Sequence, residues 1–284
     1  MTKDARANRD EKVIEEFGME WTKYDQTGAD ERDLEMQFDS YFSIFPWGSL
    51  KEGCVGYDLG CGSGRWDAYL APRVGQLHCL EPSADALAVA RKRLSGFSNV
   101  TLHQCGVEAL PFPDSSMDFG VSLGVLHHVP DTGQGIRECA RVLKRDAPFL
   151  VYLYYNFENR PAWFRALWWV SNLMRRGICR LPFRLKAAVT TLIATFVYYP
   201  LARGSAMLER IGVSKAVVDV IPLSSYRNWS FYWMRTDALD RFGTRLEKRF
   251  SREDIRRMMT DAGLVNISFK EGRPMWTALG YKAE

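Results

Sequence analysis

The sequence predicts a doubly wound α/β fold: a mostly parallel, seven-stranded sheet with an antiparallel C-terminal hairpin and a helical cap insertion. Three observations predict this fold. Short apolar segments alternate with segments of helical length between residues 54 and 155. A glycine-rich turn, Gly60–Gly64, follows the first apolar segment. The alternation stops at residue 157 and returns near residue 236, after a long aromatic and basic stretch.

Five short apolar segments are predicted strands, separated by segments long enough to form helices. The strands are expected at residues 54–59, 76–80, 100–105, 117–123 and 149–155. Helices are expected from about Arg65, over 83–94 with Ser83 as N-cap, and over 131–143. Strands that alternate with helices in this way pair in parallel, and right-handed crossovers place helices on both faces of the sheet.

The C-terminal segment is predicted to be a helix followed by a hairpin. The helix covers residues 251–262, with Ser251 as its N-cap and Gly263 after its end. Two predicted strands, 264–270 and 275–281, are joined by only four residues. A connection that short, over Glu271-Gly272-Arg273-Pro274, requires antiparallel pairing.

The remaining segments are predicted to be helical. Residues 10–47 form one or two aromatic, amphipathic helices broken near Gly28, and they either pack on the core or form a flap over an active site. The predicted division is an N-terminal helical flap, an α/β core, a helical cap insertion, and a C-terminal helix and hairpin that complete the core, over residues 1–50, 51–156, 157–235 and 236–284.

The longest uncharged run is Ala187–Ala202, which is interrupted by Pro200. It is shorter than the roughly 20 apolar residues that span a bilayer. The run therefore predicts a buried helix, with an interfacial helix as the alternative.

Charge is distributed unevenly along the chain. The net charge of +4 is too small to indicate nucleic-acid binding. Between residues 160 and 203, however, there is no acidic residue and there are eight basic ones, which leaves the rest of the chain at −4. Such an asymmetry attracts either an anionic substrate or an anionic membrane surface. The eight are Arg160, Arg165, Arg175, Arg176, Arg180, Arg184, Lys186 and Arg203.

The cysteine, histidine and N-terminal patterns indicate neither a disulfide framework nor a metal site. None of the six cysteines has CxxC spacing, and the four histidines lack the spacing of a helical metal site. The polar N-terminus is typical of neither a secretory signal nor a transit peptide. We therefore expect a cytoplasmic protein, with peripheral contact with an anionic membrane as a second expectation.

The glycine turn between the first strand and the following helix indicates a ligand site. Glycine permits positive φ and close approach of the backbone to a ligand, and the helix start offers free N–H groups. The turn has G-x-G-x-G spacing without the Lys-Ser/Thr of a phosphate-binding P-loop. Glu81 follows the second strand, 17 residues after Gly64. Its carboxylate is suited to accept both ribose hydroxyls of an adenosyl ligand; the alternative is a solvated strand end.

Asp58-Leu-Gly-Cys-Gly-Ser-Gly64 resembles the first motif of the class I methyltransferase family that depends on S-adenosylmethionine (SAM), in its small-molecule branch with a Rossmann-like fold. The resemblance covers residues 54–155 and 237–281. It implies that Asp58 and the glycines hold the methionine end of SAM and Glu81 the ribose. The segment 106–112 resembles the adenine-site segment, with Gly106 where many members carry Asp. The implied cofactor-binding residues are Asp58, Gly60, Cys61, Gly62, Ser63, Gly64, Trp66, Glu81, Pro82, Ser83, Val107, Glu108, Leu123 and Gly124.

Two adjacent histidines follow the predicted fourth strand, in the segment that resembles the family's methyl-transfer motif. His127 is the candidate general base, because a histidine titrates near neutral pH. His128 is the second candidate; the alternative is that one of the two histidines, His128 rather than His127, packs and hydrogen-bonds locally. A carboxylate or hydroxyl between residues 157 and 249 is an open alternative. Phe17-Gly-Met-Glu-Trp21 resembles a segment that precedes the domain in some members and predicts a lid contact.

The resemblance implies transfer of a methyl group from SAM to a small-molecule acceptor, with S-adenosyl-L-homocysteine as the product. The aromatic and basic insertion favours an apolar, aromatic or anionic acceptor. The alternatives are a lipid- or polyprenyl-directed methyltransferase at the membrane surface and a non-catalytic SAM-binding protein. A dehydrogenase is disfavoured by the G-x-G-x-G spacing and the hairpin. Nucleic-acid methylation is disfavoured because Gly124-Val-Leu-His127 stands where an Asn/Asp-Pro-Pro-Tyr motif would lie.

Overall fold

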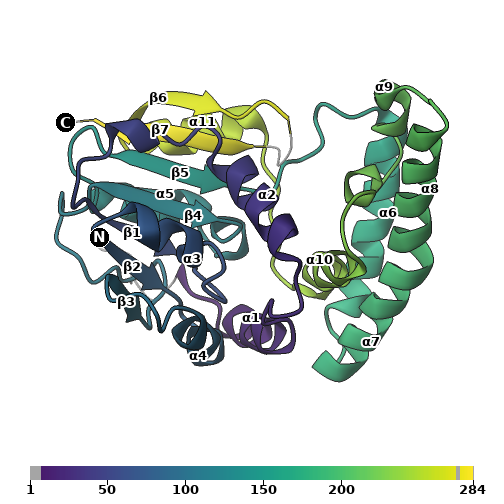
Figure 1. The fold of residues 1–284 in the computed structure, drawn as a ribbon, viewed down its shortest axis with the longest axis horizontal. Helices are drawn as coiled ribbons and strands as arrows, with labels where there is room; N and C mark the ends of the chain where they lie inside the picture. The colour runs from purple at the N-terminus through teal and green to yellow at the C-terminus, as the bar shows by residue number, and fades with distance from the viewer. Residues whose placement is uncertain (1–7, 273–275, 284) are drawn as a thin grey trace. The chain divides into compact units, whose positions relative to one another are not determined.

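The computed structural model describes residues 8–272 and 276–283, which divide into two compact units. The first unit comprises Met1–Gln26, Glu35–Glu158 and Leu246–Glu284. The second comprises Thr27–Leu34 and Asn159–Arg245. Figure 1 shows the sheet of the first unit and the long helices of the second.

The first unit is built on a seven-stranded sheet with the order β3-β2-β1-β4-β5-β7-β6. Strands β1 to β5 pair in parallel, and β7 pairs antiparallel with both β5 and β6. The predicted doubly wound, mostly parallel sheet with a C-terminal hairpin is therefore confirmed (Figure 1). The strands are β1 (Val55–Leu59), β2 (Gln76–Leu80), β3 (Val100–His103), β4 (Phe119–Leu123), β5 (Pro148–Tyr152), β6 (Leu264–Phe269) and β7 (Thr277–Lys282).

The helices of this unit begin where the sequence places capping residues. Ser83 accepts a hydrogen bond from the Ala86 N–H at the start of α4 (Ala84–Arg93). Asp131 caps α5 (Thr132–Arg141), and Ser251 with Asp254 forms a capping box at α11 (Arg252–Asp261). The helix after the glycine turn is shorter than predicted. It comprises only α3 (Asp67–Leu70) and a 3₁₀ turn, η3 (Ala71–Arg73), which carries a proline in its first turn.

The N-terminal aromatic segment forms two helices, as predicted, with Gly28 between them. They are α1 (Glu11–Lys23) and α2 (Glu31–Phe42), and a 3₁₀ turn, η2 (Trp47–Ser49), follows. Helix α1 packs against α4. The guanidinium of Arg93, the last residue of α4, donates to the carbonyl of Asp25, which follows the C-terminal end of α1. The predicted hairpin turn lies partly outside the described residues, because 273–275 are not described.

The second unit is a helical bundle with its own apolar core. Helix α10 packs on α6, on α7 and on the π-helical segment η5. Met234 and Ala238 of α10 contact Ala194 and Tyr198 in this core. Helix α10 therefore runs through the boundary predicted at residue 235, because its apolar face is buried within the insertion. The elements are α6 (Ala162–Ile178), α7 (Phe183–Ile193), η5 (Ala194–Tyr198), α8 (Tyr199–Arg210), α9 (Lys215–Val218), η6 (Ser224–Tyr226) and α10 (Phe231–Gly243).

The prediction of a buried helix over Ala187–Ala202 is wrong for one of its faces. Ala187, Ala194 and Ala202 are buried, but Leu192 and Phe196 are exposed. Pro200 does not end the helix, because the π turn of η5 precedes it and helix α8 continues to Arg210. A π turn changes the spacing to the preceding carbonyls and so accommodates a ring that would otherwise clash.

Candidate cofactor and methyl-transfer site

The glycine turn lies at the carboxyl end of β1, against the neighbouring strand and the loop after β4. The Gly60 and Cys61 N–H groups donate to the Leu80 carbonyl at 2.7 and 3.1 Å. Gly60 has φ +78, and a Cβ there would lie 2.3 Å from a methyl carbon of Val125. Only glycine satisfies both constraints, so the turn is held close to the segment that follows β4.

Glu81 reaches back from the end of β2 to the glycine turn. Its carboxylate accepts from the Gly62 N–H at 3.1 Å and from the Ser83 N–H at 2.9 Å. The side chain is buried, and burial raises the pKa of Glu81 to about 7, although the two backbone N–H groups oppose the rise. The carboxylate is thus fixed between the turn and the start of α4, which is where a ribose is held in a doubly wound fold.

Two further carboxyls are buried behind the same turn. Burial raises the pKa of Asp67 to about 6, although its hydrogen bond from the Cys79 thiol at 3.0 Å opposes the rise. Burial and the neighbouring Asp67 raise the pKa of Asp58 well above its usual range. Asp67 was missed by the sequence analysis, because one acid in the first turn of a helix is typical of ordinary capping.

The charges and hydrogen-bonding groups around the glycine turn fit SAM. Three buried carboxyls surround a turn that leaves one Asp67 oxygen and the Ser63 hydroxyl without a hydrogen-bond partner in the described part of the chain. Buried acids and an unpaired hydroxyl favour a ligand that brings positive charge and donors, and SAM carries an ammonium, a sulfonium and ribose hydroxyls. When bound, SAM supplies an electrophilic methyl group. Asp58, Asp67 and Glu81 are the residues that would hold its polar parts.

We expect the affinity for SAM to fall on acidification. Asp67 and Glu81, with pKa values of about 6 and about 7, gain protons as the pH falls. A protonated Asp67 no longer pairs with the ammonium, and a protonated Glu81 is a weaker acceptor for the ribose hydroxyls. The Kd measured by calorimetry should therefore rise about tenfold or more between about pH 8 and about pH 5.5. A Kd that stays constant over this range would exclude the ionised carboxyls from binding.

Helix α1 covers the glycine turn and the start of α4. A Cβ on Gly62 would lie 2.9 Å from the Trp21 indole, and a Cβ on Gly18 would lie 2.3 Å from the Ser83 hydroxyl oxygen. The Phe17 ring packs on His128, with 4.9 Å between ring centroids. Trp21, Gly18 and Phe17 therefore bring one face of α1 onto three parts of the site, as the predicted lid contact requires.

The two residues that precede Asp10 and α1 contact the segments around Glu108 and Asp131. The Asn8 amide donates to the Asp131 carbonyl and accepts from the Asp131 N–H, at 2.9 and 2.6 Å. The Arg9 guanidinium forms an ion pair with Glu108 at 2.9 Å. Glu108, an implied adenine-site residue, is therefore already bound to Arg9. Neither Asn8 nor Arg9 was predicted, because the partners of both lie about 100 residues or more away in the chain.

Replacing Gly18 with alanine tests the contact of α1. The new methyl group would overlap the Ser83 hydroxyl, so we expect a loss of about 1–3 kcal/mol in stability and weaker SAM binding. Gly204, also within a helix, has no atom within 4 Å of the position of a Cβ. Alanine there should stabilise the protein by up to about 1 kcal/mol. Equal melting temperatures for the two variants would contradict the close approach.

The other implied cofactor-binding residues lie in different surroundings. Leu123 and Gly124 end β4 beside the turn, and the Gly124 N–H donates to the Tyr152 carbonyl. Val107 packs in the core cluster of the first unit. The Trp66 ring is buried and packs on Tyr41 at 5.7 Å. Pro82 and Ser83 form the connection from Glu81 to α4, where Ser83 is the N-cap.

His127 is fully buried beside β5. Its Nδ1 accepts from the Tyr154 N–H at 3.4 Å, and its ring stacks on the Tyr154 ring with 3.7 Å between centroids. Nε2 has no hydrogen-bond partner in the described residues. Burial, and then the electrostatic influence of the neighbouring His128 and Arg249, hold the pKa of His127 well below its usual range. The ring is therefore neutral at physiological pH and, because Nδ1 is an acceptor, carries its proton on Nε2.

His128 has the opposite arrangement. Its Nδ1 lies 2.6 Å from the Leu246 carbonyl, which can only accept, so Nδ1 carries the proton. In the neutral ring the lone pair is then on Nε2. The local hydrogen bond predicted for His128 is present, and it fixes the tautomer that suits catalysis.

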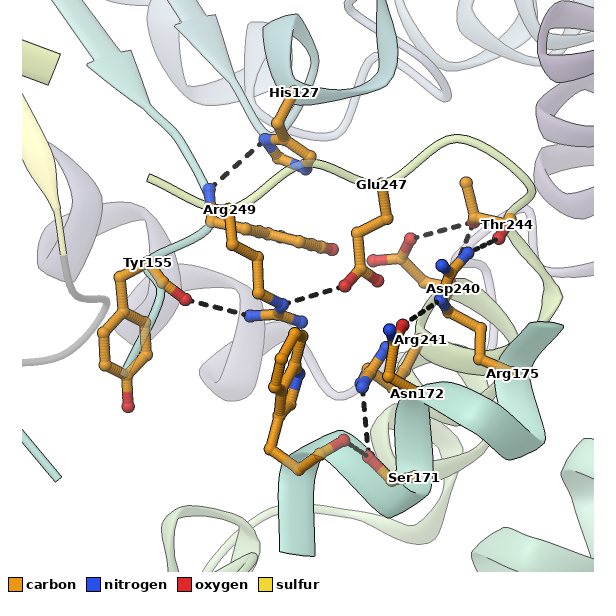
Figure 2. Close-up of polar contacts among 12 residues, drawn as sticks. His127, Tyr155, Ser171, Asn172, Arg175, Asp240, Arg241, Thr244, Glu247 and Arg249 are labelled. Atoms are coloured by element: carbon orange, nitrogen blue, oxygen red, sulfur yellow. Dashed lines mark hydrogen bonds and ion pairs between the residues drawn. The ribbon is translucent and has the colours of Figure 1, made fainter. Parts of the chain in front are cut away.

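An ion pair and several aromatic rings lie beside the histidines. The Arg249 guanidinium bonds to Glu247 at 2.8 Å and donates to the Tyr155 carbonyl at 3.2 Å (Figure 2). It also lies 5.0 Å from the centre of the Tyr154 ring. The Glu247 side chain is 1% exposed, so this is a buried charge pair. This pair was not predicted from the sequence, because Glu-Lys-Arg is typical of a solvated charge run.

Comparison with known proteins agrees with this geometry. Residues 57–151 match a family model described as a methyltransferase domain. This part of the chain is a SAM-dependent methyltransferase domain. The matched residues lie within the first unit and include Asp58, the glycine turn, Glu81 and both histidines.

Two similar proteins extend the comparison. An uncharacterized methyltransferase of Bacillus subtilis, YcgJ, is 34% identical over 104 residues, which are 36% of this chain and 41% of that protein. A demethylmenaquinone methyltransferase of Bacillus licheniformis is 32% identical over 100 residues, 34% of this chain and 43% of that one. The chain thus spans less than half the length of these relatives.

A solved structure resembles almost the whole chain in fold. It belongs to the complex of the Haloferax volcanii Trm112 methyltransferase activator and a methyltransferase, and it has a TM-score of 0.51 at 16% identity. The match covers 94% of this chain and 98% of that one. At this identity the likeness concerns the fold alone.

Proposed function

We propose that this protein transfers the methyl group of SAM to a small-molecule acceptor and releases S-adenosyl-L-homocysteine. The observation that carries the proposal is the set of three buried carboxyls, Asp58, Asp67 and Glu81, around the glycine turn. Burying three carboxyls side by side is unfavourable, and such a cluster with perturbed pKa values is typical of a site that binds a ligand or carries out a reaction.

The chain's own residues then have three tasks. The carboxyls orient SAM, so that its methyl group faces the acceptor in line with the breaking bond to sulfur. Helix α1 and the aromatic rings exclude water. His128 takes the proton from the acceptor atom as the new bond to the methyl carbon forms. In this proposal the Nε2–H group of His127 donates a hydrogen bond to the acceptor.

The surroundings of the histidines support an apolar or aromatic acceptor. Phe17 and Tyr154 border the histidine pair, and Tyr152 lies 6.4 Å from the His127 ring centre. The relative named for demethylmenaquinone is consistent with an aromatic acceptor, although its match covers a third of this chain.

The test is a transfer assay with methyl-labelled SAM and an extract of source cells, partitioned into organic, aqueous and protein fractions. We expect label in the organic fraction with the wild-type protein and none with Asp58→Asn, which removes one carboxylate at nearly constant shape. Label in the aqueous fraction would replace the apolar acceptor by a polar one. SAM binding with no transfer to any fraction would refute the enzyme and favour a non-catalytic SAM-binding protein.

A further inference from the structure

The second unit exposes an unusual amount of apolar surface on α6. Trp163, Leu167, Val170 and Met174 recur at the i, i+4, i+7 and i+11 positions of one helical stripe, and each is about half exposed. Trp169, which is 58% exposed, widens this stripe. Soluble proteins seldom leave a continuous row of large apolar side chains in water, so the stripe indicates a contact surface.

The continuous helix α7–η5–α8 carries a second such stripe. Leu185, Leu192, Phe196 and Tyr199 follow one another at helical spacing, and Phe196 is 72% exposed. The opposite side of the same helix, including Ala194 and Ala202, packs in the core with α10. Phe183–Arg210 is the one helix in the described residues that is long and apolar enough to cross a membrane, and 33% of its most apolar stretch is buried.

Seven of the eight basic residues of this segment separate into two groups. Some are structural: Arg175 donates to the Thr244 carbonyl and to Asn172 (Figure 2), and Arg203 donates to the carbonyls of Arg227 and Trp229. Lys186 is buried. The exposed ones accompany the apolar stripes on α6, on α7 and between them. They are Arg165, Arg176, Arg180 and Arg184.

We propose that the outer faces of α6 and α7–η5–α8 bind the surface of an anionic lipid membrane. Large apolar side chains enter the boundary between headgroups and acyl chains, and the four arginines pair with anionic headgroups. Because no acidic residue lies between residues 160 and 203, nothing in this segment repels such a surface. The proposal gives the proposed methyl transfer a location at the membrane surface. It rests on the proposed function in one respect only, namely that the acceptor would be a molecule dissolved in the membrane.

The structure favours this partner over two others. A spanning orientation of Phe183–Arg210 would take α10, which packs along it, into the hydrocarbon together with Asp237, Asp240 and Arg241. A second copy of the chain would bring the same arginines opposite one another across a two-fold axis, with no acid of the segment to offset them. A flat membrane with negative charge meets neither obstacle.

The experiment is flotation of the full-length protein with vesicles, without SAM. We expect it to float with phosphatidylcholine vesicles that contain about a third phosphatidylglycerol and to be released at about 1 M salt, where charges are screened beyond about 3 Å. Phe196→Glu should reduce the bound fraction about tenfold, and the double variant Arg180→Gln, Arg184→Gln should do the same. Vesicles of phosphatidylcholine alone should bind little.

Val265→Glu is the matched control, because Val265 is an exposed apolar residue of the first unit, 43% exposed, and should float like the wild type. Equal flotation with neutral vesicles, or equal flotation of Phe196→Glu and wild type, would overturn the proposal. Concentration-dependent dimerisation without vesicle binding would overturn it in favour of self-association. Retention at high salt would overturn it in favour of a spanning helix. Since SAM is absent, failure here leaves methyl transfer intact, and docking without transfer would refute only the proposed function.

Discussion

Replacing Glu81 with glutamine is expected to weaken SAM binding about 100-fold, because hydrogen bonds to a charged group contribute about 1.5–3 kcal/mol each and the ribose makes two. The amide keeps the shape of the side chain but loses the charge. It also turns an NH₂ group toward either the Gly62 or the Ser83 N–H, which now donate to the carboxylate. Calorimetric titration with SAM measures the effect directly.

The control for this variant is Glu253→Gln. Glu253 lies in the same unit, its side chain is 80% exposed, and its nearest cation is 3.9 Å away. The Glu253→Gln variant should bind SAM with the same Kd as the wild type. If Glu81→Gln also bound like the wild type, the carboxylate between the glycine turn and α4 would serve only to hold the backbone.

Replacing His128 with alanine is expected to lower kcat by about 10²–10⁴, the usual contribution of a general base. The hydrogen bond from its Nδ1 to the Leu246 carbonyl leaves the lone pair on Nε2. Binding of SAM should change little, so the loss should appear in kcat and not in the Kd for SAM.

His127 provides the comparison, because its Nδ1 accepts a hydrogen bond and its Nε2 carries the proton. Glutamine can supply a similar donor, so His127→Gln should retain more turnover than His127→Ala. Both should retain more than His128→Ala. If instead His127→Ala and His127→Gln were equally inactive while His128→Ala turned over normally, the roles would be reversed and the first interpretation of the sequence would be correct.

The sheet was predictable because its signals are local. Apolar strands, capping residues such as Ser83 and Ser251, and the spacing of the glycine turn each depend on a few adjacent residues. The hairpin followed from the short connection between its strands. The same reasoning misjudged Ala187–Ala202, since an uncharged run gives its length and composition but not which of its faces other helices cover.

The site was predictable only in part. Asp58, the glycine turn and Glu81 are brought together by consecutive strand ends, which chain order already implies. Asn8, Arg9 and Asp67 act through partners that become neighbours only after folding. The tautomers of His127 and His128 depend on the backbone groups of Tyr154 and Leu246, which no pattern of residue types reveals.

The most direct test of the central claim is calorimetric titration of the full-length protein with SAM and, separately, with NAD⁺. Both ligands offer a ribose to the Glu81 carboxylate, but only SAM brings the ammonium and sulfonium that match the carboxyls of Asp58 and Asp67. We predict saturable binding of one SAM per chain at neutral pH and no binding of NAD⁺. Binding of NAD⁺ without binding of SAM would contradict the account and return the glycine turn to a dinucleotide site.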